Sequence, residues 1–152
     1  MADVTDLQPY SANERGLVDV LVDFKETLPN PIVFKVVGYQ AVAFENVTQG
    51  DALYSRASDG KVGKARANGT LDEATVAGFA ETTKSAGQAV RAIVSGQVAS
   101  SQTLDAGDIF FLSNTTPGQI IKTPPTTAGH FITIVGEAAN TNELIVRTKR
   151  PI

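Results

Sequence analysis

The chain has 152 residues and a formal net charge of −3, from 13 basic and 16 acidic side chains. This length is typical of one compact domain with its own hydrophobic core. The negative charge argues against a grip on nucleic acid phosphates. The absence of cysteine excludes a disulfide framework, a thiolate nucleophile and a cysteine-based metal site.

Residues 1–40 are expected to form an N-terminal arm. The chain starts with acidic residues and shows no apolar signal-peptide region, so we expect synthesis in a cytoplasm. No apolar run approaches the roughly 18 residues of a membrane helix, so no membrane partner is expected.

The apolar stretch of the arm, GLVDVLVDF, fits two structures. On a strand, Val18, Val20, Val22 and Phe24 share one face; on a helix, Leu17, Val20, Leu21 and Phe24 do. A capping-box pattern at 11–14 fits the helix, whereas the β-branched valines favour the strand. Pro29 and Pro31 then break any helix. We favour an extended arm, partly paired as a strand and covered by the domain or by a partner, because a bare apolar strand promotes aggregation.

Beyond the arm, short β-strands are expected at regular intervals. Apolar runs at 51–57, 61–65, 75–81 and 88–94 are followed by similar runs at 108–113, 119–123, 131–138 and 143–148. The turn sequences ASDG (57–60) and TTPG (115–118) separate the first two runs of each set. GTLDEATV (69–76) has room for a single helical turn. The sequence therefore predicts an all-β fold, an antiparallel sandwich or barrel.

The two sets of strands look like copies of one module. Gly50-Asp51 and Gly107-Asp108 are 57 residues apart, Gly60 and Gly118 are 58 apart, and Val90-Arg91 and Val146-Arg147 are 56 apart. We predict a first module at 41–100 and a second at 101–152, together one compact domain at 41–152. Six residues are assigned to structural turns: Gly50, Asp51, Gly60, Gly107, Asp108 and Gly118.

No catalytic, cofactor or metal site is predicted. The glycine-rich stretches lack the spacing of a phosphate loop. His130 is the single histidine, has no partner ligands for zinc, and no Gly-x-Ser-x-Gly elbow accompanies it. Asp51 and Asp108 hold equivalent places, so a carboxylate pair is conceivable, but an Asp after Gly more often holds turn backbone. We therefore expect a protein that is not an enzyme.

The stretch AGDIFFLSNTTPGQIIKTPPTTAGHFITIVGEAANTNELIVRT resembles a module that recurs in tailed-bacteriophage virion proteins. The similarity is carried by Gly107-Asp108, 110–113, 116–118, 123–129, 135–138 and 142–146, and with the first copy it covers about residues 41–148. The resemblance implies a virion structural protein. That family carries no catalytic residues, so it supplies none here.

The resemblance implies, as the favoured role, a capsid decoration (cement) protein on the outer capsid surface. Its expected partners are the major capsid protein and itself, as a homo-oligomer, with a trimer favoured over a dimer. The arm would supply the partner-binding residues, which are Leu17, Val18, Val20, Leu21, Val22, Phe24, Pro29 and Pro31. A tail-fibre tip or tail adaptor that binds the host surface is the alternative. A cellular enzyme or ligand-binding barrel stays open for the case in which the repeat arises by chance.

Overall fold

The computed structural model describes residues 35–152, and Lys35–Ile152 form one compact unit. The residues assigned to partner binding in the arm, 17–31, lie outside the described residues. The choice between a strand and a helix for the stretch GLVDVLVDF also concerns residues outside the described part of the chain.

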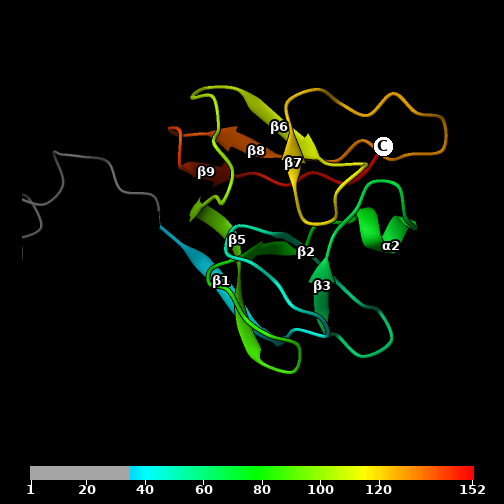
Figure 1. Cartoon of the computed structure of the whole chain (residues 1–152), viewed down its shortest axis with the longest axis vertical. Helices are drawn as coiled ribbons and strands as arrows, with labels where there is room; N and C mark the ends of the chain where they lie inside the picture. Colours follow the sequence, from blue (N-terminus) through cyan, green and yellow to red (C-terminus); the bar gives the residue numbers. More distant parts are fainter. Residues whose placement is uncertain (1–34) are drawn as a thin grey trace, which may run out of the picture. The chain divides into compact units, whose positions relative to one another are not determined.

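The described unit is almost entirely β, as the sequence predicts. Its nine strands are β1 Val37–Val42, β2 Ala52–Ser55, β3 Val62–Lys64, β4 Gly78–Ala80, β5 Ala89–Ala99, β6 Ile109–Leu112, β7 Ile120–Ile121, β8 Ile134–Ala138 and β9 Glu143–Val146. Eight of them follow the order β3-β2-β4-β5-β9-β8-β6-β7, with every pair antiparallel, and β1 joins this path by pairing with β5 (Figure 1). The end strands β3 and β7 do not pair with each other, so the sheet is open rather than a closed barrel.

The stretch 69–76, which has room for a single helical turn, contains one as α2, Leu71–Ala74. Thr70 is its N-cap, and the Thr70 hydroxyl accepts a hydrogen bond from the Glu73 backbone N–H at 3.2 Å. Thr75 ends the helix in an extended conformation. Asp72 and Glu73 in the first turn interact favourably with the positive end of the helix dipole.

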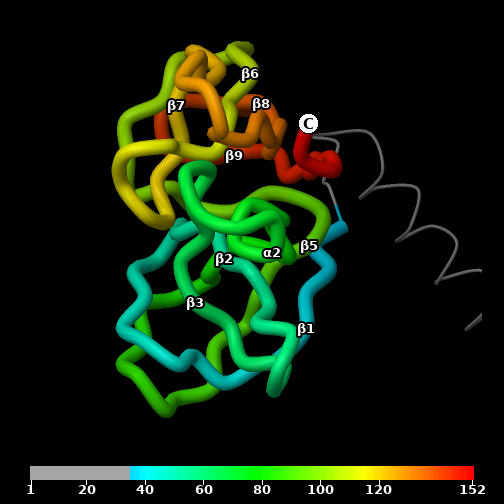
Figure 2. Tube along the Cα trace, turned by 90° about the vertical axis from the view of Figure 1, so that its right-hand side faces the viewer, coloured from blue at the N-terminus to red at the C-terminus, as the bar shows by residue number. Residues whose placement is uncertain are grey.

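Strand β5 belongs to both halves of the unit. Its first part pairs with β1 and β4, and from Gly96 onward it pairs with β9. Gly96 has φ +101°, and a Cβ atom there would lie 2.6 Å from the Lys35 carbonyl oxygen. Only glycine therefore fits where β5 exchanges one set of partners for the other. In the tube view β5 lies between the lower and the upper group of strands (Figure 2).

The hydrophobic core also spans both halves. The larger cluster takes Tyr54, Phe79 and Ile93 from the first half and Phe110 and Leu144 from the second, among 16 buried residues. A smaller cluster lies within the first half and consists of Ala43, Val47, Leu53, Val62, Ala80, Val90 and Ala92. Because the larger cluster mixes residues from before and after β5, the two halves share one interior.

Gly78 and Gly136, each inside an expected strand, lie where the backbone packs closely or changes register. Gly78 in β4 lies so close to β5 that a Cβ atom would come within 2.9 Å of the Ile93 carbonyl oxygen. In β8 the register against β6 shifts, because Phe110 lies opposite Gly136 and Phe111 lies opposite Ile134. These are the close packing and the bulge expected from a glycine in a β-rich run.

Candidate functional site

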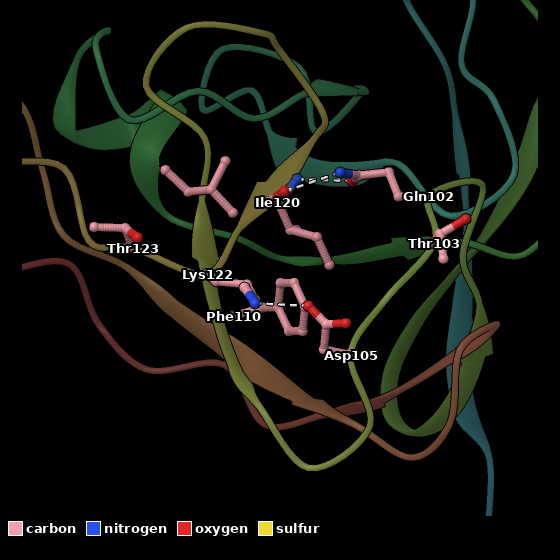
Figure 3. A pocket seen from close by; sticks show the side chains of 8 residues that line it. Gln102, Thr103, Asp105, Phe110, Ile120, Lys122 and Thr123 are labelled. Carbon is pink, nitrogen blue, oxygen red and sulfur yellow. Dashed lines mark hydrogen bonds and ion pairs between the residues drawn. The ribbon is translucent and has the colours of Figure 1, made fainter.

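An open pocket lies at the end of the sheet formed by β6 and β7. It has a volume of about 500 Å³ and is lined by Gln102, Thr103, Asp105, Phe110, Ile120, Ile121, Lys122 and Thr123 (Figure 3). Strands β6 and β7 form one wall, and the loop after β5 brings Gln102 to Asp105 against it. Phe110 is only 4% exposed, so the pocket offers no open aromatic face to a ligand.

The side chain of Gln102 closes the outer edge of β7. Its Nε2 donates to the Ile120 carbonyl oxygen and its Oε1 accepts from the Ile120 N–H, both at 2.9 Å (Figure 3). One amide thus makes the two hydrogen bonds that a neighbouring strand would make. Because Ile120 is buried, its backbone groups would otherwise lack partners.

We expect Gln102→Met to lower the free energy of unfolding by about 1–2 kcal/mol, because two hydrogen bonds to the Ile120 backbone are lost. Urea unfolding of the full chain followed by circular dichroism measures this loss. Gln119→Met is the matched control, because the Gln119 side chain makes no hydrogen bond to any described residue and should leave stability nearly unchanged. Equal effects of the two substitutions would contradict the role of Gln102.

Lys122 supplies the positive charge of the pocket. Its Nζ lies 2.6 Å from Asp105 Oδ2 and 3.4 Å from Asp108 Oδ2. The pKa of Lys122 is raised above its ordinary value, first by the hydrogen bond to Asp105 and second by the hydrogen bond to Asp108. All three side chains are exposed, so solvent screens these ion pairs and each contributes little to stability.

Two further depressions continue the surface beside Lys122. One, of about 540 Å³, is lined by Gly107, Asp108, Ile109, Phe111, Lys122 and Thr123. The other, of about 270 Å³, is lined by Ile109, Ile134, Gly136, Glu137, Arg147 and Lys149. Ile109, which is 55% exposed, lies between these two and gives the surface an apolar centre. Such a surface offers both charged and apolar groups to a partner.

The four turn glycines named from the sequence all have left-handed backbone. The φ angles are +88° at Gly50, +75° at Gly60, +86° at Gly107 and +82° at Gly118. Two of them differ sharply in their surroundings: Gly60 is exposed, whereas Gly118 is buried. The Gly118 N–H donates to the Ala65 carbonyl oxygen at 2.8 Å.

The two aspartates at equivalent sequence positions lie in different environments. Asp51 is 4% exposed, and its Oδ2 accepts a hydrogen bond from the Thr48 N–H at 2.8 Å. Burial raises the pKa of the Asp51 carboxyl above 3.8, and the Thr48 hydrogen bond and the charge of Lys64 partly oppose this. Asp108 instead points to Lys122 at the surface. Asp51 therefore holds turn backbone, and Asp108 belongs to the pocket surface.

We expect Asp51→Asn to alter how stability depends on pH. The folded state holds the Asp51 proton more tightly than the unfolded chain, so the contribution of Asp51 to the unfolding free energy falls as pH rises from 3.8 through the raised folded pKa. Asparagine keeps an uncharged oxygen that can accept the hydrogen bond from the Thr48 N–H. Urea unfolding at pH 4 and pH 7 should show the variant gaining on the wild type at pH 7.

Asp108→Asn is the control for this comparison, because Asp108 lies at the surface, and the variant should follow the wild-type pH profile more closely. A difference between Asp51→Asn and wild type that is the same at both pH values would contradict the assignment.

His130 lies at a turn, where its backbone N–H donates to the Thr127 carbonyl oxygen at 3.1 Å. The ring atom Nδ1 of His130 lies 3.1 Å from the side-chain nitrogen Nδ2 of Asn114. Asn114 is thus a side-chain hydrogen-bond partner of this ring.

Within residues 35–152, no group of three or more histidine or acidic side chains is arranged to hold a metal ion. No helix in this part of the chain has the length and apolarity required to cross a membrane. No known family model and no curated protein sequence matches the chain.

Proposed function

We propose that this chain is a non-enzymatic structural protein of a tailed-bacteriophage virion, and that it decorates the outer capsid surface. It would bind the major capsid protein and stabilise the shell, with residues 4–34 of the arm contributing to the contact. The proposal rests on the resemblance of residues 107–146 to a module of phage virion proteins.

One structural observation supports the use of that resemblance. The motif residues serve the backbone of the scaffold: the Gly107 N–H donates to the Ala138 carbonyl oxygen at 2.8 Å, and the Ala138 N–H donates to the Asp108 carbonyl oxygen at 2.9 Å. The bonds Gly50 to Ala80 and Ala80 to Asp51 repeat this pattern at 2.8 and 2.9 Å. A motif that encodes hydrogen-bonded scaffold suits a protein whose task is assembly.

We also propose that the two halves are copies of one module. The order β3-β2-β4-β5 in the first half corresponds to β7-β6-β8-β9 in the second. Leu53 lies opposite Gly78, and Phe110 lies opposite Gly136, at offsets of 57 and 58 residues. The last strands of the two halves, β5 and β9, correspond at an offset of 52 residues rather than the 56 expected from the sequence. Ala80 lies opposite Ala92 in the first half, and its counterpart Ala138 lies opposite Leu144 in the second. A crystal structure whose halves fail to superpose over β2–β4 and β6–β8 would contradict this.

The test of the virion role is the copy number of this chain per purified virion, measured by quantitative mass spectrometry against the major capsid protein. A decoration protein should be present in hundreds of copies, in simple proportion to the capsid protein. A few copies per particle would place it in the tail, and absence from virions would refute the proposal.

The arm can be tested separately. A chain lacking residues 1–30 is expected to keep the folded domain and to lose binding to capsid shells, measured by co-sedimentation with shells stripped of this protein. A double substitution within the arm, Val20→Asp with Phe24→Asp, should weaken binding in the same way, whereas Asp19→Asn should not. Undiminished binding of the shortened chain would contradict the role of the arm.

The second candidate is a tail-fibre tip or tail adaptor that contacts a host-surface glycan. The surface around Lys122 favours it, because Thr103, Asp105, Asp108 and Thr123 place hydroxyls and carboxylates around one cation. Binding of the purified chain to a glycan array, lost on Lys122→Ala, would select this function. No binding to any glycan would count against it.

A further inference from the structure

Edge strands of a sheet expose unpaired backbone groups, and proteins usually cover or guard them. At β3, the Val62 carbonyl oxygen accepts from the Phe44 N–H at 2.9 Å, and the Lys64 N–H donates to Glu45 Oε2 at 2.8 Å. At β7, Gln102 takes the place of a neighbouring strand. Both ends of the main strand order are therefore closed by the chain itself.

The strand β1 is different. Val37–Val42 pair with β5 on one side, and among the described residues no hydrogen bond reaches the other side. This side, which is unpaired within residues 35–152, is called the β1 edge below. The sequence of β1, VGYQAV, contains no charged residue and no proline, which are the residues that usually guard an edge.

The β1 edge also carries exposed apolar side chains. Val37 is 41% exposed, Tyr39 39% and Val42 38%. Ala41 lies opposite Val90 and packs against the smaller core cluster, and Tyr39, opposite Ala92, follows on the same face of β1. That cluster contains no aromatic residue, and Ala41 is the β1 residue that packs against it. A further strand on the β1 edge would extend this core.

We propose that two copies of this chain associate through their β1 edges, with the two β1 strands paired antiparallel across a two-fold axis. An identical pair of edges is self-complementary under two-fold symmetry. Such an axis places one residue opposite its own copy, either Tyr39 or Gln40. In the first register Val37 lies opposite Ala41, and in the second Gly38 lies opposite Val42. Because β1 is uncharged, neither register sets like charges against each other within the strand pair.

A contact of six residues on each side is smaller than a standard interface of about 800 Å² per partner, so the dimer should be concentration-dependent. Identical edges close as a dimer, so a three-fold oligomer would need another surface. The inference does not depend on the virion role, because every measurement below uses the isolated full chain.

Sedimentation velocity over a range of concentrations tests the proposal. The wild-type chain should convert from monomer to dimer, and Tyr39→Lys should weaken dimerisation at least tenfold, because it sets two lysines close together across the axis. Val42→Lys is a second variant for the case in which Tyr39→Lys impairs folding, which its thermal unfolding would reveal. Leu71→Lys is the control: Leu71 is 56% exposed on α2, and this variant should dimerise as the wild type does.

Disulfide trapping gives the geometry, because the chain has no cysteine of its own. Tyr39→Cys or Gln40→Cys should form disulfide-linked dimers on oxidation, since directly opposed residues have Cβ atoms about 4.5–5.5 Å apart. Leu71→Cys should not. A wild type that stays monomeric, a Tyr39→Lys variant that associates normally, or a trimer that traps no disulfide at 39 or 40 would each overturn the proposal.

Discussion

Replacing Phe79 with alanine is expected to lower the free energy of unfolding by about 3–5 kcal/mol. Phe79 is fully buried and is the largest such side chain among the described residues. It lies in β4 opposite Ala52 of β2 and Ile93 of β5, so its ring packs where three strands meet. Alanine would leave a cavity that the paired backbones on both sides prevent from closing. Urea unfolding of the full chain measures the loss.

Leu71→Ala is the matched control for Phe79→Ala. Leu71 is an apolar side chain of similar character, but it is exposed on α2, and its replacement should change stability by less than about 0.5 kcal/mol. A loss below about 1 kcal/mol for Phe79→Ala would mean that the core is not built around this ring.

The second large effect is expected at Gly118. Gly118→Ala should lower the free energy of unfolding by about 2–3 kcal/mol, and Gly60→Ala by about 1–2 kcal/mol. Both glycines have left-handed φ angles, so both alanines carry similar backbone strain. At Gly118 a Cβ atom would also lie 3.0 Å from Asp51 Cγ, whereas at Gly60 nothing lies within 4 Å.

The neighbours of Gly118 cannot easily move aside. Its N–H donates to the Ala65 carbonyl oxygen and its carbonyl oxygen accepts from the Ala52 N–H, both at 2.8 Å. Shifting the turn would break these two bonds to the first half. Urea unfolding of the two alanine variants side by side decides the matter, and equal losses would show that the contact with Asp51 imposes no strain.

Most of the β-structure could be predicted from local signals. Runs such as DALYSRA and DIFFLS combine β-formers with flanking turn residues, and these signals are complete within a few residues of chain. The helical turn at 71–74 was likewise set by Thr70 and the acidic residues after it. Strand β1 was less evident, because Gly38 and Gln40 interrupt its apolar pattern and its pairing partner lies some fifty residues away.

The pocket could not be predicted from the sequence. Gln102 and Ile120 are 18 residues apart, and Lys122 and Asp105 are 17 apart, with no motif linking them. Their meeting depends on how the loop after β5 folds against β7, which is a matter of tertiary packing. The same holds for the difference between Asp51 and Asp108, which occupy corresponding positions in the sequence but differ in burial. Gly118 of the second half lies against Asp51, whereas Asp108 lies at the surface beside Lys122.

The shared strand β5 has a consequence for how such a domain can be cut or recombined. A chain divided after β5 would leave Gly96–Ala99 without the partners that β9 supplies, and would expose the Phe79 side of the common core. A chain divided before β5 would instead leave β1 and β4 without the partner that β5 supplies. We therefore expect neither half, as a product of proteolysis, splicing or gene fusion, to fold on its own. The smallest piece that can be transferred intact to another protein is therefore the whole of Lys35–Ile152, although its sequence reads as a repeat of something half that size.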